Sequence, residues 1–426
     1  MLANIGREEI FKAVRPQFHV LRFFGLAPYN LNIKQSETSG KNKKLLSPLL
    51  YQVFVIMLAT ASSIASIHCK ELRYYITKSA PRRTSSVLYW ISNSCTSVVA
   101  MIFTGIHHKQ IVGILKALST TDDVFSPSVT FYQNVHKFLI VEMLLTYLSI
   151  FAIGCYHTWI WFVAFKIDLY VIGVFVYYCI ISATELQFIN MVYLLYYRYK
   201  ALNQRLEAEF DSKFSEHSIE NNINRHEIPA YFGKEFPQHT KTAFNLKIWF
   251  EGSKNKEASL ASRLRILRKH QHGLRNIGDE INGAYRVSIL CDMISSFIGI
   301  TVHLYASLYF ATNDVAKLGL STCLINHVII VNLCWLVFMV VKLACVCSVC
   351  HIAGTETSRT AVLLRSALLE EQLSSPTAAE IQCFLEQAVN RPLHFSACGF
   401  FNIDYSFLGS FIGLVATYII ILMDFK

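Results

Sequence analysis

Seven long apolar blocks limit what this chain can fold into more than any other feature. Each block is long enough to cross the hydrocarbon core of a bilayer, because an α-helix rises about 1.5 Å per residue and the core is about 30 Å thick. A segment that crosses lipid must satisfy its own backbone hydrogen bonds, so the blocks predict helices. The blocks are residues 46–68, 87–106, 138–156, 168–197, 287–310, 324–347 and 407–425.

Composition supports a membrane protein and excludes several other classes. Of the 426 residues 53% are hydrophobic, and the mean hydropathy of +0.37 is too high for a soluble enzyme of this length. The net charge of +10 fits basic loops that face anionic lipid. The sequence shows no glycine-rich phosphate loop, nucleophile–base pair or cofactor fingerprint. We expect an all-α, multi-pass plasma-membrane protein that binds membrane lipids, binds no nucleic acid or cofactor, and is not an enzyme.

The segment before the first block has the pattern of an amphipathic helix. Phe11, Val14, Phe18 and Leu21 recur at helical spacing. This stripe predicts a helix that lies at the membrane interface. We expect Pro28 to end it.

Three of the blocks are longer than a bilayer requires. The fourth continues through residues 198–206, an apolar stripe over residues 260–285 leads into the fifth, and the sixth continues to residue 369. A Ser-Pro pair at 375–376 then predicts a helix start, and Asn-Arg-Pro at 390–392 predicts its end. The inner ends of these helices predict a bundle, which is either an oligomer hub or a cap on one subunit.

The last block carries small and polar residues on one helical face. Gly413, Thr417, Ile420 and Asp424 follow a 4-3-4 spacing. An ionisable residue inside a span is a functional candidate, so this face is a candidate pore lining. The alternative is that Asp424 lies at the water interface and pairs with Lys426.

A cysteine-rich stretch lies at the end of the sixth block. Cys345, Cys347, Cys350 and His351 have a spacing that zinc sites use, but no second ligand cluster accompanies them. We expect core packing or palmitoylation here instead of a metal site.

Two familiar classes of membrane protein fit poorly. A rhodopsin-like receptor would carry Asn-Pro-x-x-Tyr and Asp/Glu-Arg-Tyr signatures, and proline is absent from the last three blocks. A transporter would show an internal repeat or a pair of spans broken by glycine or proline, and neither is visible.

The end of the chain resembles the insect gustatory receptor family. Thr417-Tyr418, five apolar residues and Asp424-Phe425 are similar to the family signature of Thr-Tyr, five hydrophobic residues and Gln-Phe. The resemblance is strong over the last 75 residues, 352–426, and weak elsewhere. Upstream matches to the family spacing are Glu356, Phe384, Gln387, Phe395, Ala397, Gly399, Phe400, Phe401 and Asp404.

The resemblance implies a seven-transmembrane-helix fold with a cytoplasmic N-terminus, an extracellular C-terminus and a cytoplasmic helical anchor domain. It also implies a ligand-gated, non-selective cation channel, built as a homotetramer or as a heteromer with related receptors. The ligand would be a small tastant. A sugar such as fructose is one class, because residues 26–29, His303-Leu304-x-Ala306 and the spacing of Trp335 from His351 look similar to the fructose-sensing branch of the family. A bitter compound is the other class. The alternative is a G-protein-coupled or accessory subunit that does not conduct alone.

On this interpretation the chain divides into six segments. They are a cytoplasmic N-terminal segment with the amphipathic helix (1–45), transmembrane helices 1–4 (46–197), a cytoplasmic loop with anchor helices (198–286), transmembrane helices 5–6 (287–347), further cytoplasmic anchor helices (348–406) and a pore-lining helix 7 (407–426).

The resemblance also places a ligand pocket in the outer half of each subunit, among the second to sixth blocks. An aromatic platform and convergent polar groups suit a sugar, and Trp335 with Asn332 or His303 with Tyr305 can supply both. Helix packing or a place in the interfacial aromatic belt is the alternative for each residue. The candidates are Trp335, Asn332, His303, Tyr305, Tyr309, Asn326, Asp168, Tyr177 and Trp90.

The candidates for the pore and gate are Thr417, Ile420, Ile421, Asp424 and Phe425. Asp424 stands where the family has Gln, so a tetramer would carry a ring of four carboxylates that attracts cations. We hypothesise that Asp424 shapes cation selectivity and divalent block. Closure would then fall to Ile420 or Ile421, through dewetting of an apolar constriction.

Overall fold

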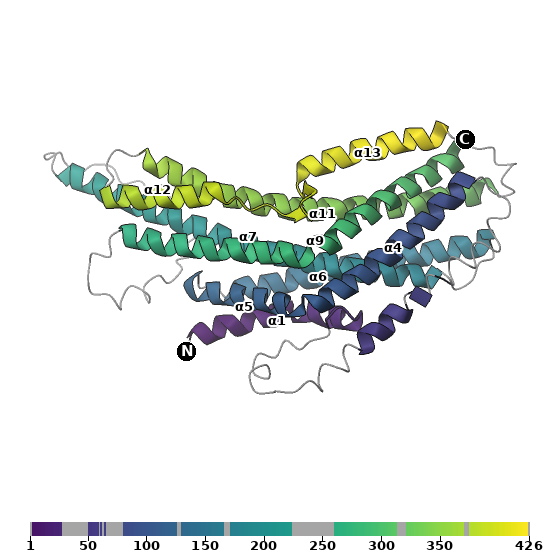
Figure 1. The fold of residues 1–426 in the computed structure, drawn as a ribbon, viewed down its shortest axis with the longest axis horizontal. Helices are drawn as coiled ribbons and strands as arrows, with labels where there is room; N and C mark the ends of the chain where they lie inside the picture. Colours follow the sequence, from purple (N-terminus) through teal and green to yellow (C-terminus); the bar gives the residue numbers. More distant parts are fainter. Residues whose placement is uncertain are drawn as a thin grey trace, which may run out of the picture. The chain divides into compact units, whose positions relative to one another are not determined.

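The computed structural model describes residues 2–27, 50–58, 60–61, 64, 80–125, 129–165, 171–223, 260–312, 321–369 and 375–424 (Figure 1). Almost all of them are helical. The helices are α1 (Leu2–Phe23), α4 (Ala80–Ile106), α5 (His108–Phe125), α6 (Val129–Phe165), α7 (Val171–Ile223), α9 (Leu260–Thr312), α11 (Thr322–Leu368), α12 (Ser375–Asn390) and α13 (Tyr405–Asp424), and two short strands, β1 (Ser396–Ala397) and β2 (Phe401–Asn402), precede α13.

Six helices in the described part of the chain are long and apolar enough to cross a membrane. They are α4, α6, α7, α9, α11 and α13, and they contain the second to seventh predicted blocks. The first block, residues 46–68, lies largely outside the described residues. Helices α7 and α9 have 53 residues each and α11 has 47, whereas about 20 suffice to cross a bilayer. The prediction that these three helices are longer than a bilayer requires is therefore confirmed.

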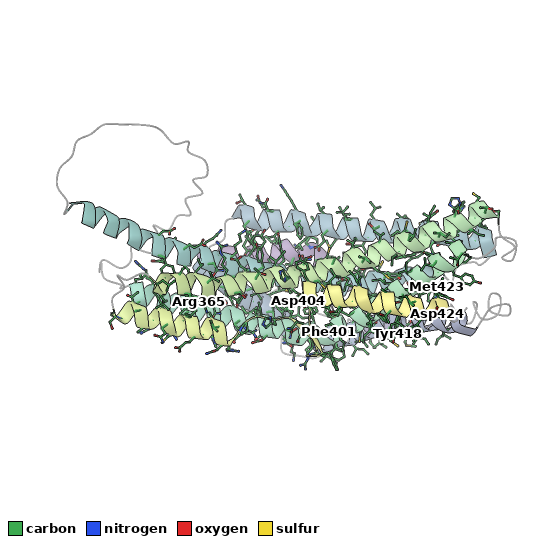
Figure 2. All side chains as sticks on the ribbon, turned by 90° about the horizontal axis from the view of Figure 1, so that it is seen from above. Arg365, Phe401, Asp404, Tyr418, Met423 and Asp424 are labelled. Carbon is green, nitrogen blue, oxygen red and sulfur yellow. The ribbon has the colours of Figure 1, made fainter. Side chains whose placement is uncertain are left out.

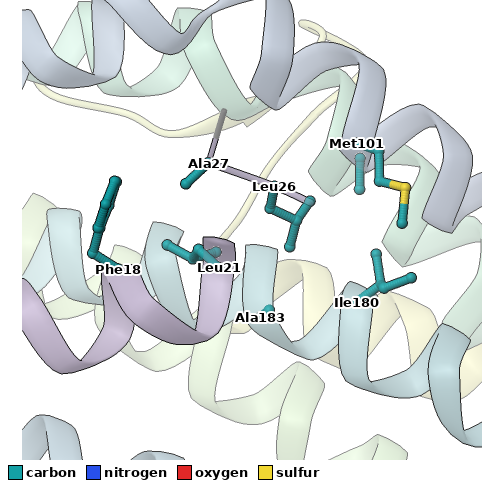
Figure 3. Packing of buried hydrophobic residues seen from close by; sticks show 8 residues of the cluster. Phe18, Leu21, Leu26, Ala27, Met101, Ile180 and Ala183 are labelled. Carbon is teal, nitrogen blue, oxygen red and sulfur yellow. The ribbon is translucent and has the colours of Figure 1, made fainter. Parts of the chain in front are cut away.

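The apolar stripe of α1 faces other helices of the same chain. Phe11, Val14, Phe18 and Leu21 are all buried, and α1 packs along α5 and α6. The predicted amphipathic helix is thus present. Its apolar face is covered by protein, whereas the sequence interpretation placed the helix at the membrane interface. Figure 3 shows the cluster at its end, which contains Phe18, Leu21, Leu26, Ala27, Ala100, Met101, Ile180 and Ala183.

Helix α1 ends at Phe23, and Pro28 is not what ends it. Gly25 has a φ of 73°, a conformation that glycine adopts without strain. The Gly25 amide donates to the Arg22 carbonyl at 3.1 Å, and the Leu26 amide donates to the Leu21 carbonyl at 2.8 Å. These two bonds form a Schellman cap, which satisfies the last carbonyls of the helix. The prediction overlooked this glycine because it weighed the proline alone.

The described part of the chain is helical, in agreement with the all-α prediction, apart from one short hairpin. Strands β1 and β2 pair antiparallel, with Ala397 opposite Phe401. Cys398, Gly399 and Phe400 connect them. Cys398 and Gly399 have φ values of 52° and 79°, and the Phe400 amide donates to the Ala397 carbonyl at 3.0 Å. Two successive positive φ values are typical of a type I′ turn, which matches the twist of a hairpin. The pairing is too short to give an alternating pattern in the sequence.

The contacts divide the chain into two compact units. The larger comprises residues 1–198, 274–355 and 393–426, and the smaller comprises residues 199–273 and 356–392. In the smaller unit Asn203 donates to Glu356 Oε1 at 2.9 Å and accepts from Thr360 at 2.7 Å. Arg268 pairs with the buried Glu380 at 2.7 Å. Helix α12 begins and ends where the Ser-Pro and Asn-Arg-Pro sequences predict.

Candidate functional site

Trp335 lies at the centre of a buried group of aromatic side chains in the larger unit. It is 2% exposed, and its ring stacks on Tyr178 of α7 with centroids 4.3 Å apart and planes 18° apart. Its Nε1–H donates a hydrogen bond to Nδ1 of His157 on α6 at 3.1 Å. Phe338 meets the indole edge to face at 5.9 Å. Three helices therefore meet around one indole ring.

His303 of α9 joins this group to a line of hydrogen bonds. The Asn332 Nδ2 donates to the Val328 carbonyl at 2.7 Å, so its Oδ1 accepts from His303 Nδ1, 2.9 Å away. His303 Nε2 then accepts from the hydroxyl of Tyr89 on α4 at 3.2 Å. The Tyr89 hydroxyl is also hydrogen-bonded to that of Tyr178. This arrangement suits a neutral imidazole with both ring nitrogens engaged.

We refer to these side chains as the Trp335 cluster. Five helices, α4, α6, α7, α9 and α11, contribute to it. It combines stacked aromatic faces, including His303 parallel to the indole within 20°, with hydroxyl, amide and imidazole groups. Such a combination binds small polar ligands, which stack on a ring and exchange hydrogen bonds with the groups around it. The members are Tyr89, His157, Tyr178, His303, Asn332 and Trp335.

Three of the predicted ligand residues, Trp335, Asn332 and His303, are brought together in this cluster. The spacing argument that put Trp335 and Asn332 on one face of a helix holds, since both reach the same imidazole. Pairing His303 with Tyr305 does not hold: two residues along a helix rotate the side chain by about 200°. Tyr305 instead contacts Tyr309, at a centroid distance of 6.2 Å.

The remaining predicted ligand residues are more scattered. Trp90 is buried and meets Tyr89 edge to face at 6.3 Å. Tyr177 is buried beside Tyr178 in sequence, Asn326 is exposed near the start of α11, and Asp168 lies outside the described residues.

Sequence reasoning missed three members of the cluster: Tyr89, His157 and Tyr178. Two of them are direct neighbours of residues that were selected, Trp90 and Tyr177. One residue rotates the side chain by about 100° around a helix, so these selections pointed away from the cluster. No spacing signal marks His157, because its partner Trp335 is on another helix.

Among the six apolar helices of the described residues, α13 is the least covered, with 17% of its most apolar stretch buried against 22% in α6. Only Phe411, Val415 and Ile419 are buried. Phe411 meets Phe297 of α9 edge to face at 5.8 Å, and Tyr418 meets the same ring at 5.4 Å. Figure 2 shows Tyr418, Met423 and Asp424 along the second half of the helix.

The predicted pore residues lie on the uncovered part of α13. Thr417, Ile420, Ile421 and Asp424 are exposed, and Ile420 is 63% exposed. The Thr417 hydroxyl donates to the Gly413 carbonyl at 3.0 Å. Phe425 and Lys426 lie outside the described residues.

The upstream signature residues have structural roles. Gln387 donates to Gln271 at 2.6 Å, and Phe384 is fully buried in the smaller unit. In the larger unit Phe395 meets Phe188 edge to face at 5.8 Å. Asp404 caps α13: its Oδ1 accepts from the amides of Ser406 and Phe407 at 2.9 and 3.0 Å (Figure 2). These residues shape the chain and lie apart from the Trp335 cluster in sequence.

The cysteine-rich stretch lies in the middle of α11. Cys347 and Cys350 are buried and Cys345 is exposed. Within the described ranges, no group of three or more histidine, cysteine, aspartate or glutamate side chains is placed to hold a metal ion.

Comparisons with known proteins agree with the resemblance at the end of the chain. The chain is 26% identical over 263 residues to the Drosophila melanogaster gustatory receptor for sugar taste 43a, a match that covers 58% of this chain and 57% of that protein. It is 31% identical over 153 residues to Drosophila melanogaster gustatory receptor 68a, covering 36% of this chain and 38% of the relative. The chain thus matches about half or less of the length of these relatives.

The fold is similar to that of a solved insect receptor. Structures of the olfactory receptor OR5 from Machilis hrabei, one of them in complex with eugenol, match with a TM-score of 0.64 at 12% identity, covering 99% of this chain and 100% of that chain. This likeness shows a shared fold.

The family assignment rests on the whole length of the chain. The profile of the 7tm chemosensory receptors matches residues 14–426. With six apolar helices long enough to cross a bilayer, the chain is a multi-pass plasma-membrane protein, and it belongs to the 7tm chemosensory receptor family.

Proposed function

We propose that this chain is a subunit of a ligand-gated, non-selective cation channel opened by a small tastant. The observation that carries the proposal is the exposure of α13, an apolar helix of which only Phe411, Val415 and Ile419 are buried. A helix with Gly413 and Thr417 on an uncovered face can pack against copies of itself, since small residues allow close approach. Four such helices around an axis would form a pore.

The topology of the proposed channel follows the family resemblance. Seven spans would give a cytoplasmic N-terminus and an extracellular C-terminus, with residues 198–286 and 348–406 as cytoplasmic anchor helices. The subunits would form a homotetramer, or a heteromer with related receptors. The networks of Asn203 with Glu356 and of Arg268 with Glu380 support a stable anchor.

The Trp335 cluster is the proposed ligand site. Its stacked rings and its hydroxyl, amide and imidazole groups suit a sugar such as fructose, and the sugar-taste name of one relative supports that class. A bitter aromatic compound is the second class, and the eugenol complex of the structurally similar receptor favours it. In either case the ligand would replace hydrogen bonds that the cluster now makes internally.

The proposal is tested by recording from excised patches of cells that express this chain alone. Fructose, other sugars and a bitter panel are applied to the outer face, with no nucleotide at the inner face. We expect a fast cation current that needs no cytosolic factor. Silence from protein shown to be at the surface would contradict a homomeric channel and favour an accessory or G-protein-coupled subunit.

The ligand site is tested by two asparagines, one inside the Trp335 cluster and one outside it. Asn332→Ala should raise the half-maximal ligand concentration by about tenfold or more, because the loss of a hydrogen-bonding group costs about 1–3 kcal/mol. Asn134→Ala, at an exposed position of α6, should leave the dose–response curve unchanged. If both variants and wild type gave the same dose–response curve, Asn332 would not be part of the ligand site.

The pore assignment is tested at Asp424. Asp424→Asn removes the proposed ring of carboxylates with little change in size, so relative Ca²⁺ permeability and divalent block should both fall. Glu280→Gln, at an exposed site on α9, controls for loss of a carboxylate elsewhere. Unchanged permeability and block in Asp424→Asn would show that Asp424 does not face the ion path.

A further inference from the structure

A group of charged side chains is buried inside the larger unit, apart from the Trp335 cluster. Lys342 of α11 places its Nζ 2.8 Å from Glu185 of α7 and 2.6 Å from Asp292 of α9. The side chains of Glu185 and Asp292 are 3% and 7% exposed. Charges at such positions inside membrane-spanning helices are costly and are kept where they have a role.

The acids in this region outnumber the bases. Glu142 of α6 lines the same cavity as Glu185 and Lys342. Three carboxylates and one ammonium leave two negative charges uncompensated if all four groups are ionised. Because a buried charge is stable only when it is paired, this excess must be neutralised by protons or by bound cations, and one monovalent cation together with one proton would suffice.

A cavity at this place offers free oxygen atoms. It has a volume of about 180 Å³, several times the roughly 30 Å³ that one water occupies in the liquid. Glu185 Oε1, Glu142 Oε2 and Ser182 Oγ are buried and have no hydrogen-bond partner, and all three residues line the cavity. Glu185 and Ser182 are 2% and 1% exposed, so bulk water cannot solvate them. An unpaired serine oxygen beside unpaired carboxylate oxygens is the arrangement of an oxygen-ligand cation site.

We propose that this cavity binds a small monovalent metal cation, held by Glu185 Oε1, Glu142 Oε2 and Ser182 Oγ with water completing its coordination. The three protein oxygens are fewer than the about six to eight oxygen ligands that Ca²⁺ takes. Lys342, hydrogen-bonded to the other oxygen of Glu185, adds a fixed positive charge that repels a divalent ion more than a monovalent one. The site is separate from the proposed pore helix, and the inference goes beyond the proposed channel function.

The position of the proposed cation site along α7 and α11 suggests which part of the protein a bound cation would stabilise. Glu185 follows Tyr178 on α7 by seven residues, and Lys342 follows Trp335 on α11 by the same interval. Seven residues are about two turns, or roughly 10 Å, so both pairs lie on matching helical faces. A cation that joins α6 to α7 here, beside the ion pair that joins α7 to α11, would support helices that form the Trp335 cluster.

The test measures the thermal unfolding of the purified full-length protein in lipid nanodiscs. Na⁺, K⁺ and N-methyl-D-glucamine are compared as chlorides at pH 7.4 and constant ionic strength of about 0.15 M. The small cations should raise the melting temperature in a saturable manner relative to the organic cation, because a ligand that binds only the folded state stabilises it. Glu142→Gln should raise the half-saturating cation concentration by about tenfold or more.

Glu142→Gln is preferred to Glu185→Gln because it leaves the ion pair with Lys342 in place. Ser182→Ala supplies a second variant with no change in charge, and Glu280→Gln, at an exposed site, supplies the control. Equal melting temperatures in all three cations would overturn the proposal, as would a Na⁺ effect that persists in both Glu142→Gln and Ser182→Ala. A pH series in N-methyl-D-glucamine and a CaCl₂ titration complete the test. Stabilisation that follows pH alone, with no added effect of Na⁺ or K⁺, would overturn the cation site, and half-saturation by Ca²⁺ at a lower concentration than by Na⁺ or K⁺ would overturn the monovalent assignment.

Discussion

Two apolar helices of this chain, α7 and α13, are opposite in how polar they are and in how much of each is buried. Helix α7 is buried almost throughout residues 177–199, although that stretch contains many polar side chains. Helix α13 is far more apolar, yet only three of its twenty residues are buried. Within residues 177–199, the buried polar residues of α7 are Ser182, Thr184, Glu185, Gln187, Asn190 and Arg198.

The difference follows from what surrounds each helix. Lipid cannot satisfy a polar side chain, so a helix as polar as α7 must be enclosed by protein. An apolar helix such as α13 has no such need and is stable against lipid or against other subunits. Polarity in α7 therefore marks contacts within the subunit, and its scarcity in α13 leaves that helix free for assembly.

Among the substitutions that test this difference between α7 and α13, Arg198→Met in α7 is expected to have the largest effect. The Arg198 guanidinium lies 2.9 Å from Asp122 and donates to the Leu118 and Leu194 carbonyls at 3.2 and 2.7 Å. Arg198→Met would leave the Asp122 carboxylate buried without its charge partner, which costs about 3–5 kcal/mol. We expect a large fall in melting temperature and little protein at the cell surface.

The control for this variant is Lys137→Met, which makes a similar change at an exposed position of α6. It should stay within about 0.5 kcal/mol of wild type, as surface substitutions usually do. If Arg198→Met were equally mild, the buried polar groups of α7 would not be what holds it within the subunit.

An intermediate effect is expected from one substitution at two adjacent sites of α13. Ile419 is 8% exposed and Ile420 is 63% exposed. Ile419→Ala should lower the free energy of unfolding by about 2–5 kcal/mol, because it removes packed atoms and leaves a cavity. Ile420→Ala should change stability little and should instead raise the ligand-free current, because a smaller side chain widens an apolar constriction.

Thermal unfolding and patch recording on the same pair separate these outcomes. Comparable destabilisation at both positions would mean that Ile420 is packed within the subunit and does not face a pore. A change in ligand-free current only in Ile419→Ala would reverse the assignment of the two faces.

The apolar helices also show what the sequence could and could not predict. Helix existence and length followed from hydropathy, which is why α7, α9 and α11 were expected to exceed the bilayer. Contacts between helices depend on the rotation of each helix, which hydropathy does not give, so Trp90 and Tyr177 were selected whereas their neighbours Tyr89 and Tyr178 lie in the Trp335 cluster. Trp335 and Asn332 were paired correctly because they share one helix.

The buried charges offered a signal that was not used. Glu142, Glu185, Asp292 and Lys342 each interrupt an apolar block, and ionisable residues at such positions are candidates for function. The sequence interpretation applied that argument to Asp424 alone. Which acid faces which base could not have been predicted, since the four residues come from four helices.

The smallest effect concerns the start of α13, where the subunit does fix this helix. Asp404 caps it, and the hydrogen bonds from the Ser406 hydroxyl and from the Phe407 amide lower the pKa of the Asp404 carboxyl. A lowered pKa means that the stabilisation is complete above the ordinary value of about 3.9 and is lost as pH falls through the folded-state value. Asp404→Ala should therefore cost about 1 kcal/mol near neutral pH.

The pH dependence distinguishes this cap from a packing role. The difference in melting temperature between wild type and Asp404→Ala should be constant from about pH 7 to pH 5 and should narrow below about pH 4, where the wild-type carboxyl becomes protonated. The melting temperature of Asp404→Asn, which keeps a side-chain acceptor but no charge, should lie between those of wild type and Asp404→Ala. Its difference from that of Asp404→Ala should not narrow at low pH. A gap that stays the same at every pH would mean that the ionised carboxylate does not hold the first turn, and α13 would then depend on its apolar contacts alone.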